Sequence, residues 1–331
     1  MFLQKRGDKV ANATMCLQKR GDEGTWVRDW NYANSSFYLS TGGANRKANA
    51  YNKSTPGAPY RWETSWRWQD DNCEIHVTTL DGFCEVCKSL GITRIAFLGD
   101  SMTGLLDISL HGLLRCPHAQ RVPCPSSIQL ETMFHRLNTN ISDSVGLEAT
   151  RDFIVNNTIG RTAVVANVGV HCHSHQVFKE SLKDLLGWMS ELPSTVLPFF
   201  RASSPGHKGC KPRGRWTKYD WSKGTQVFPL ENYTEWKKTD NGMHDWNLIE
   251  DYNQFAQDYI ADHHRDIHYI NIFNSTVLRR DGHMGGNDCL HYWTPGPVDW
   301  WAHFLYSTLI DLATIAGEQG PRQLVNESYS E

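Results

Sequence analysis

Ser101 stands in a Gly-Asp-Ser tripeptide that directly follows a short apolar run, Ile92–Leu98. The pattern predicts a strand, a tight turn and then a helix, so that backbone N–H groups and a helix N-terminus point toward the serine. A serine in that position can act as a nucleophile if a base accepts its proton and N–H groups stabilise an oxyanion. By itself, the tripeptide could equally be a turn with a helix N-cap.

Asp288 and His291 lie three residues apart in the segment Asp288-Cys-Leu-His291. In a loop or a first helical turn, this spacing lets a carboxylate hold one imidazole nitrogen while the other nitrogen faces a serine. Either residue alone would be an ordinary surface side chain. Because Ser101 follows one expected strand and this pair is expected to follow another, the three residues together predict a catalytic triad.

The elements that must position these residues are visible from about residue 91 onward. Apolar runs typical of strands occupy residues 92–98, 127–137, 162–170, 195–200 and 267–273. Helical periodicity occupies residues 103–114, 177–192, 248–264 and 299–316. The alternation predicts an α/β fold with a mostly parallel central sheet, helices on both faces, and a site at the carboxyl ends of the strands.

The rest of the chain is expected to be irregular. Residues 1–60 are polar and rich in Gly, Asn and Ser with little periodicity, which predicts loop. We therefore divide the chain into an irregular segment, 1–90, packed on a catalytic domain, 91–331, with a long basic insertion at about 205–245.

Composition restricts the class of protein. The 331 residues are 40% hydrophobic and 21% charged, which is typical of a globular chain. The net charge of −3 gives no reason to expect nucleic acid or an anionic membrane as a partner. We find no apolar run of ~18 residues that could cross a membrane, and no signal-peptide pattern at the N-terminus.

Cysteines and glycosylation sequons indicate an oxidising compartment. The chain has nine cysteines, an odd number that leaves at least one unpaired. Chance would give about three N-x-Ser/Thr sequons, whereas this chain has eight, which favours a lumenal environment and disulfides. The sequons begin at Asn12, Asn34, Asn52, Asn140, Asn156, Asn232, Asn274 and Asn326.

Seven blocks, in order over roughly residues 16–315, carry a resemblance to a known family. They are Gly24–Asp29, Trp66–Gln69, Phe97–Ser101, Asn167–Gly169 with His171, Arg201–His207, Leu278–His283 and Asp288–Gly296. As a set they resemble the PC-esterase superfamily, in particular the plant trichome birefringence-like polysaccharide O-acetyltransferases.

The resemblance implies an SGNH/GDSL-like three-layer sandwich and an acetyl-serine intermediate. It implies that Ser101 is the nucleophile, His291 the base and Asp288 the residue that orients the base. The backbone N–H groups of Ser101 and Gly169 and the Asn167 side chain would form the oxyanion hole. Arg201 and His207 would lie nearby as substrate-binding residues.

Departures from the plant pattern suggest a divergent branch, such as an algal or protist member. The family has Arg and Asn three and four residues after the serine, where this chain has Gly104 and Leu105. Trp293 replaces a cysteine of the closing block. The resemblance still implies the pairs Cys16–Cys73 and Cys210–Cys289, and leaves Cys84, Cys87, Cys116, Cys124 and Cys172 unassigned.

Two other groups of residues could form a metal or redox site. His171-Cys-His-Ser-His175 could ligate a metal, although zinc sites usually draw on two separated clusters. Cys84-Glu-Val-Cys87 could be a redox pair, but structural disulfides fit the compartment better. We expect no metal and no bound cofactor, with an acetyl donor (acetyl-CoA or another carrier) as co-substrate. The basic stretch Lys208–Arg215 is a solvated loop, or it meets an anionic acceptor or donor phosphates.

The sequence thus predicts an O-acetyltransferase that passes an acetyl group through Ser101 to a hydroxyl of a cell-wall or secretory polysaccharide. An esterase of the same fold would share every catalytic residue, and a non-catalytic polysaccharide-binding protein is the third alternative. We expect a monomer in the Golgi lumen, with a polysaccharide or oligosaccharide as its partner.

Overall fold

A six-stranded, mostly parallel sheet forms the centre of the computed structural model, which describes residues 2–29, 66–116, 121–125, 129–137, 145–208, 210, 229–238, 243–285, 288–292, 294 and 296–319. The strand order is β4-β5-β3-β6-β7-β8. The bounds are β3 Ile92–Gly99, β4 Arg121–Val122, β5 Leu130–Arg136, β6 Arg161–Ala166, β7 Val196–Arg201 and β8 His268–Ile270. Only the short edge strand β4 pairs antiparallel among these six. The predicted mostly parallel sheet is confirmed.

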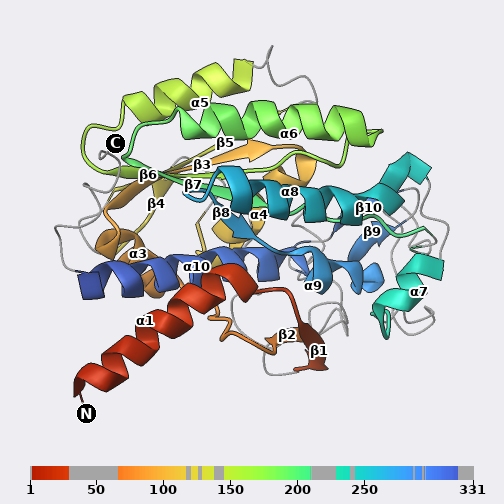
Figure 1. The fold of residues 1–331 in the computed structure, drawn as a ribbon, viewed down its shortest axis with the longest axis horizontal. Helices are drawn as coiled ribbons and strands as arrows, with labels where there is room; N and C mark the ends of the chain where they lie inside the picture. The colour runs from red at the N-terminus through yellow and green to blue at the C-terminus, as the bar shows by residue number, and fades with distance from the viewer. Residues whose placement is uncertain are drawn as a thin grey trace, which may run out of the picture.

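Helices cover both faces of this sheet, as Figure 1 shows. One face carries α5 (Val145–Val155), α6 (His175–Ser190) and α8 (Ile249–His263), while the other carries α3 (Leu80–Ser89), α4 (Ser101–Leu113) and α10 (Val298–Gln319). Strands β6 and β7 are buried along nearly their whole length, as expected for parallel strands covered on both sides. The result is the predicted three-layer α/β sandwich.

The N-terminal region differs from the expectation of loop. Residues 2–19 form one helix, α1 (Phe2–Lys19), and the chain then continues into β1 (Gly24–Arg28). Strand β1 pairs antiparallel with β2 (Trp66–Asp70). Helix α1 is rich in polar residues, and its stability comes from packing against α10 rather than from a clear apolar stripe. Residues 30–65 lie outside the described part of the chain.

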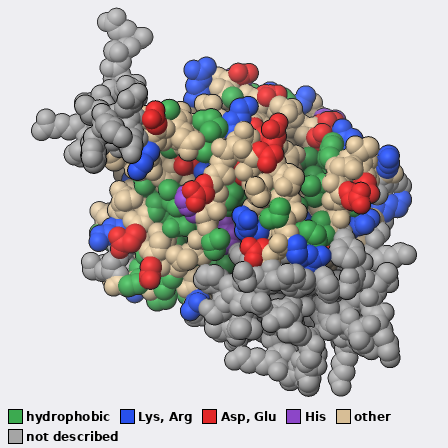
Figure 2. All heavy atoms as spheres, turned by 90° about the horizontal axis from the view of Figure 1, so that it is seen from below, with side chains coloured by type: hydrophobic (Ala, Val, Ile, Leu, Met, Phe, Trp, Pro, Cys, Tyr) green, Lys and Arg blue, Asp and Glu red, His purple; other side chains and the backbone are tan. Residues whose placement is uncertain are grey.

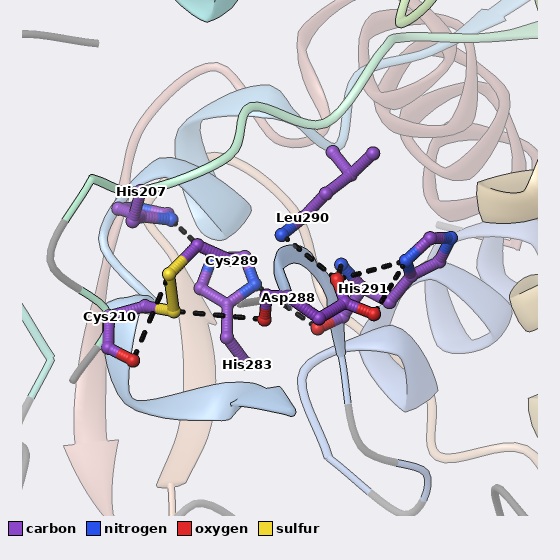
Figure 3. Close-up of a disulfide and its surroundings, with 7 residues drawn as sticks. All are labelled: His207, Cys210, His283, Asp288, Cys289, Leu290 and His291. Atoms are coloured by element: carbon purple, nitrogen blue, oxygen red, sulfur yellow. Dashed lines mark hydrogen bonds and ion pairs between the residues drawn. A yellow bond between two sulfur atoms is a disulfide. The ribbon is translucent and has the colours of Figure 1, made fainter. Parts of the chain in front are cut away.

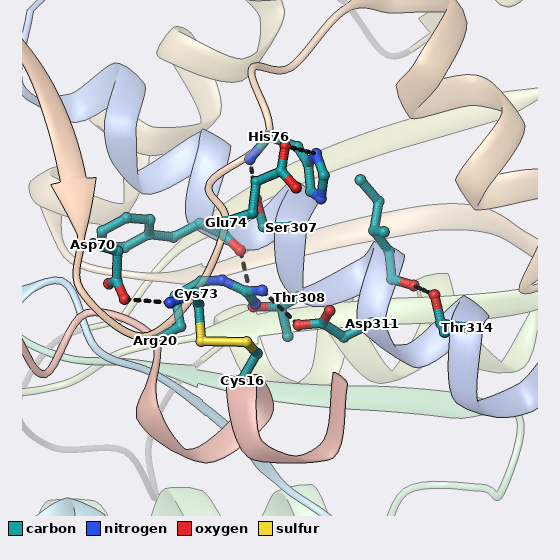
Figure 4. Close-up of polar contacts among 12 residues, drawn as sticks. Cys16, Arg20, Asp70, Cys73, Glu74, His76, Ser307, Thr308, Asp311 and Thr314 are labelled. Carbon is teal, nitrogen blue, oxygen red and sulfur yellow. Dashed lines mark hydrogen bonds and ion pairs between the residues drawn. A yellow bond between two sulfur atoms is a disulfide. The ribbon is translucent and has the colours of Figure 1, made fainter. Parts of the chain in front are cut away.

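Covalent and ionic contacts hold α1 to the sandwich (Figure 4). A disulfide joins Cys16 in α1 to Cys73, which follows β2. Arg20 donates to the Asp311 carboxylate of α10 at 2.5 Å and to the Thr308 hydroxyl at 3.2 Å. Both charged side chains of this pair are largely buried, so the contact orders the end of α1 against α10.

The core is continuous across the proposed boundary at residue 90. Trp68 of β2 and Phe83 of α3 belong to the same buried cluster as Phe97 of β3. Trp26 packs edge-on against Trp68 and Trp300, and its indole N–H donates to the Ser275 carbonyl at 2.8 Å. The N-terminal elements therefore complete the wall of the sandwich instead of lying on it as an irregular cover.

Short elements fill the region near the carboxyl ends of the strands. They are α7 (Tyr233–Lys238), a 3-10 turn (Met243–Leu248), α9 (Phe273–Val277), a second 3-10 turn (Arg280–Gly282), β9 (His283–Gly285) and β10 (Asp288–Tyr292). Of the predicted insertion at 205–245, residues 209, 211–228 and 239–242 lie outside the described residues, as does part of the basic stretch Lys208–Arg215. The expected strand 267–273 is shorter, because α9 begins at Phe273.

Within the described ranges, no helix combines the length and the apolar character that a membrane span requires. On the face shown in Figure 2, acidic and basic side chains are interspersed instead of forming a patch of one sign.

Candidate active site

The turn after β3 exposes a serine at the first position of a helix. Asp100 is the N-cap of α4, and its carboxylate accepts from the N–H groups of Met102 at 2.8 Å and Thr103 at 3.4 Å. A side chain on Gly99 would come within 2.4 Å of the Thr103 hydroxyl and 3.0 Å of the Asn167 carbonyl. Asp100 thus caps α4, and Gly99 lets the turn lie close to Thr103 and Asn167. Ser101 is left half-buried at the carboxyl end of β3.

The carboxyl end of β3 brings together the side chains of Ser101, His291 and Asp288. The Ser101 hydroxyl is 2.7 Å from His291 Nε2, and His291 Nδ1 lies 3.0 Å from each carboxylate oxygen of Asp288. The carboxylate fixes the proton on Nδ1, so Nε2 is the acceptor that faces the serine. The arrangement can accept a proton from the serine hydroxyl during nucleophilic attack.

Asp288 and His291 lie on a strand, not in the expected loop or helical turn. In a regular strand, residues three apart point to opposite faces, so they could not contact each other. The pairing of β10 with β9 is irregular between Asp288 and Tyr292, and this irregularity turns the two side chains to the same side.

The Asp288 carboxylate is held in its ionised form. Burial opposes ionisation, but hydrogen bonds from the His291 ring and backbone N–H, with that from the Leu290 N–H, outweigh it. Together they lower the pKa of Asp288 to about 2. A permanently charged carboxylate beside Nδ1 favours the imidazolium that forms when His291 takes a proton.

Gly169 lies in the loop that follows β6, with φ +154°. A side chain there would come within 2.2 Å of the Ser203 hydroxyl, so this backbone can approach the site only as glycine. The Gly169 backbone N–H stays a predicted oxyanion donor, together with that of Ser101.

The Asn167 side chain is engaged elsewhere than expected. Its amide nitrogen donates to the Arg201 carbonyl at 2.7 Å and to the Ser203 hydroxyl at 3.1 Å. Both of its N–H groups are used in fixing the loop to the end of β7, so in this conformation they do not point to an oxyanion. Asn167 supports the loop that carries Gly169.

Arg201 lies beneath the serine turn and is fully buried. Its guanidinium donates to the Thr103 hydroxyl at 3.1 Å and to the Ala202 carbonyl at 2.6 Å, and it lies over the ring of Trp301. Burial lowers the pKa of Arg201 to about 10, against the opposing charge of Asp100. Arg201 therefore braces the start of α4 and is not exposed to a substrate.

His207 is also buried, and it pairs with a second histidine, His283 (Figure 3). His207 Nδ1 lies 2.6 Å from His283 Nε2, while His207 Nε2 lies 2.7 Å from the Val277 carbonyl and His283 Nδ1 lies 3.2 Å from the His291 carbonyl. The pair thus links Val277 to the backbone of His291. His283 also stacks on Tyr292, with ring centroids 4.1 Å apart.

This chain of contacts needs three N–H protons, because both terminal carbonyls only accept. Two neutral imidazoles carry two. Burial lowers the pKa of His207 to about 4 and that of His283 well below its usual range, so the pair is neutral near pH 7. The neutral pair therefore satisfies two of the three contacts, and the long 3.2 Å contact to His291 is the one that fits a missing proton.

Three disulfides are present: Cys16–Cys73, Cys84–Cys124 and Cys210–Cys289. The first and third are the pairs implied by the resemblance, and the second was not predicted. Cys210–Cys289 borders the Asp288–His291 pair (Figure 3), so it ties β10 to the segment after β7.

The remaining thiols, Cys87, Cys116 and Cys172, are free and buried. Burial raises the pKa of Cys116 to about 11 and that of Cys172 to about 12, which keeps both as unreactive thiols.

The three histidines of the segment after β6 are exposed, and two of them lie close to acidic side chains. His173 lies 3.1 Å from Asp245, and His175 lies 3.6 Å from Asp251. Within the described ranges, no group of three or more His, Cys, Asp or Glu side chains is arranged to hold a metal ion.

Gly104 and Leu105, which replace Arg and Asn of the plant pattern, pack against other residues of the fold. Leu105 is buried in the core, and a side chain on Gly104 would touch the Phe134 ring at 3.1 Å. An arginine at 104 would therefore displace Phe134 of β5. Trp293 lies outside the described residues.

Sequence reasoning missed four residues that support the site from behind: Thr103, Ser203, Asn253 and His283. Ser203 and His283 stood inside recognised blocks, but nothing in spacing alone identifies a hydrogen-bond partner across the fold. Asn253 holds Ser203 by two hydrogen bonds, at 2.7 and 2.9 Å, and the only advance sign was its position within a predicted helix.

Comparison with known proteins gives a family match for part of the chain. No curated protein matches the chain. Residues 155–308, which include Asp288 and His291, match the PC-Esterase family model, described as a GDSL/SGNH-like acyl-esterase family found in Pmr5 and Cas1p. This family implies cleavage or transfer of acyl esters on polysaccharides. Residues 155–308 of the chain are therefore a PC-esterase domain.

Proposed function

We propose that the protein is an O-acetyltransferase of the secretory pathway that uses Ser101, His291 and Asp288 as its catalytic triad. The observation that carries the proposal is the 2.7 Å contact between the Ser101 hydroxyl and His291 Nε2, with Asp288 on the opposite ring nitrogen. The acceptor would be a hydroxyl of a cell-wall or secretory polysaccharide, and the donor acetyl-CoA or another acetyl carrier. A monomer in the Golgi lumen is part of the same proposal.

In the first half-reaction, the Ser101 oxygen attacks the acetyl carbonyl while its proton passes to His291 Nε2. The new C–O bond gives a tetrahedral oxyanion, for which the backbone N–H groups of Ser101 and Gly169 are the candidate donors. Collapse breaks the bond to the donor's leaving group, which takes the proton from His291. Acetyl-Ser101 is left.

In the second half-reaction, a sugar hydroxyl gives its proton to His291 and attacks the acetyl-serine carbonyl. The bond to Ser101 breaks, and the proton returns to the serine oxygen. Asp288 holds the imidazole in the tautomer that both steps need. Arg201 and the cap residue Asp100 keep the start of α4 in place through the contacts described above.

Hydrolysis is the second candidate, and the exposure of the pair favours it. The side chain of Asp288 is 41% exposed and that of His291 is 21% exposed, so water can reach the base. If water replaces the sugar hydroxyl, the same residues form an acetyl esterase.

The test is to incubate the purified protein with an acetyl donor and with xylan, mannan or pectin oligomers. We expect acetylated oligomers by mass spectrometry, and loss of product in Ser101→Ala. Ser190→Ala is the matched control, because the Ser190 hydroxyl is also 2.7 Å from a histidine nitrogen, that of His264, on the exposed end of α6.

Release of acetate from acetylated oligomers without transfer would replace the transferase with the esterase. Retention of either activity in Ser101→Ala would contradict the triad itself, since a group other than Ser101 would then carry the acetyl.

A further inference from the structure

A polar cavity opens beside the edge strand β8. Its volume is about 290 Å³. The walls are one face of α8, the segment from β8 into α9, and the turn after α1. The lining residues are Asp22, Glu250, Asn253, Gln254, Gln257, Tyr269, Asn271, Phe273 and Asn274.

The lining has the chemistry of a neutral glycan site. Eight of the nine side chains carry an amide, a carboxylate or a hydroxyl, and the ninth, Phe273, offers an aromatic ring. Amides and carboxylates supply the donors and acceptors that sugar hydroxyls require. Two carboxylates and no basic residue line the cavity, and each carboxylate has a lysine partner outside the lining, Lys237 for Glu250 at 3.2 Å and Lys19 for Asp22 at 3.9 Å. The lining therefore offers no cation to an anionic ligand such as a uronic acid chain or a phosphate, and a neutral sugar fits it better.

Internal hydrogen bonds fix one wall of the cavity. The Asn271 amide donates to the Asp22 carboxylate at 2.9 Å, and the Asn274 amide donates to the Asp22 carbonyl at 2.6 Å. Burial raises the pKa of Asp22. A wall held in this way loses little conformational entropy when a ligand binds.

The opposite wall offers a group that is not engaged. Gln254 and Gln257 lie on one face of α8 with Glu250, spaced as successive turns of a helix. The Gln257 amide has no hydrogen-bond partner among the described residues and is half-buried at the cavity. Gln254 is exposed, and its amide donates to the Asp258 carboxylate of its own helix at 2.9 Å.

The cavity lies at the carboxyl ends of the strands, as Ser101 does. Asn271 directly follows β8, three strands from β3, which at ~4.8 Å per strand places it about 14 Å from the end of β3. Its wall residue Asn253 also holds Ser203, whose hydroxyl donates to the Val168 carbonyl next to Gly169. A polysaccharide of several sugars whose reacting hydroxyl is at Ser101 would be long enough to reach the cavity.

We propose that this cavity is a remote subsite that binds neutral sugar units of the acceptor chain. The inference rests on the proposed function for its connection to Ser101, but binding in the cavity does not need the triad. It predicts that the acceptor is a neutral polysaccharide longer than one or two sugars, rather than a uronic acid polymer.

The test measures binding separately from turnover. Ser101→Ala protein is titrated by calorimetry with a neutral β-linked hexasaccharide, such as xylohexaose, and with a galacturonic acid hexasaccharide. We expect the neutral chain to bind more tightly. Adding Gln254→Leu and Gln257→Leu should weaken its affinity about tenfold, because two hydrogen bonds are lost. Gln176→Leu, an exposed glutamine on α6, is the matched control.

Unchanged affinity in the double variant overturns the subsite, and so does equal or tighter binding of the acidic hexasaccharide. Wild-type turnover of a small chromogenic acetate ester is measured in parallel. If the wild type turns over the ester and the double variant binds the oligosaccharide with unchanged affinity, the subsite is overturned and the triad stands. Loss of affinity in the double variant, without turnover of any ester by the wild type, supports the subsite and overturns the proposed function.

Discussion

At the scale of single residues, the nucleophile and its partners were predictable because they are defined by type and spacing. Gly-Asp-Ser after an apolar run indicates a serine at a helix N-terminus, and an Asp three residues before a His indicates an oriented base. The structure brings the three side chains within hydrogen-bond distance. Asn167 was different, because the partners that engage its amide come from β7 and the segment after it, and no local pattern in the sequence reveals them.

Asp288 gives a prediction with a pH dependence. In Asp288→Asn the amide cannot favour the Nδ1 proton, so we expect kcat to fall roughly 10³- to 10⁴-fold with the fold intact, by analogy with other Ser-His-Asp enzymes. The folded-state pKa of about 2 lies below the unfolded value of 3.8, so Asp288 stabilises the fold above about pH 4 and loses this contribution as pH falls toward 2. Urea unfolding at several pH values measures it.

The difference in unfolding free energy between wild type and Asp288→Asn should shrink as the pH is lowered from 5 to 2. A difference that is independent of pH in this range would mean that the carboxylate is not held ionised by His291.

His283 gives a second prediction at this scale. Substituting it with Phe keeps a ring to stack on Tyr292 but removes both nitrogens, and with them the links to His207 and to the His291 carbonyl. We expect kcat to fall about fivefold to tenfold with KM nearly unchanged, because the 2.6 Å hydrogen bond to His207, worth about 1 kcal/mol, no longer fixes the start of β9 next to β10 and His291.

The pH profile separates positioning from a general loss of structure. If His283 positions the base, the acid limb of the pH dependence of kcat shifts in His283→Phe. The control His264→Phe, at the C-cap of α8, should leave this limb in place. An unmoved limb would assign His283 a packing role alone.

At the scale of elements, periodicity predicted the strands and long helices of the sandwich because each buries a regular face. It failed for α1, whose buried positions Ala13 and Cys16 are few, and whose stability depends on α10 nearly 300 residues later. It also failed for β10, because Asp288 and His291 share a side only through an irregularity in strand pairing that spacing cannot reveal.

The disulfide that holds α1 is therefore open to test. Cys16→Ser with Cys73→Ser removes a cross-link between residues 57 apart, and we expect a loss of about 4 kcal/mol in the free energy of unfolding. Chemical denaturation measures it, with Cys87→Ser, a buried free cysteine, as the control for replacing a core thiol. A loss below about 1 kcal/mol would show that α1 contributes little to the cooperative unit.

At the scale of the whole molecule, the compartment can be examined through the sequons. Asn12, Asn156 and Asn232 are exposed, whereas Asn274 is half-buried with its amide donating to the Asp22 carbonyl, and Ser275 and Thr276 beside it are buried. Asn34, Asn52, Asn140 and Asn326 lie outside the described residues. Excess sequons predicted a lumenal protein, but burial decides which of them a modifying enzyme can reach.

We expect protein expressed through a secretory pathway to carry glycans at Asn12, Asn156 and Asn232 and none at Asn274, as read by enzymatic deglycosylation in ¹⁸O water and peptide mass spectrometry. Asn274→Gln should leave the glycan count unchanged. A glycan at Asn274 would require its amide to leave Asp22 and would fill the cavity proposed as the acceptor subsite. A bare Asn274 beside modified exposed sites would support the lumenal compartment and leave this cavity open to an acceptor chain.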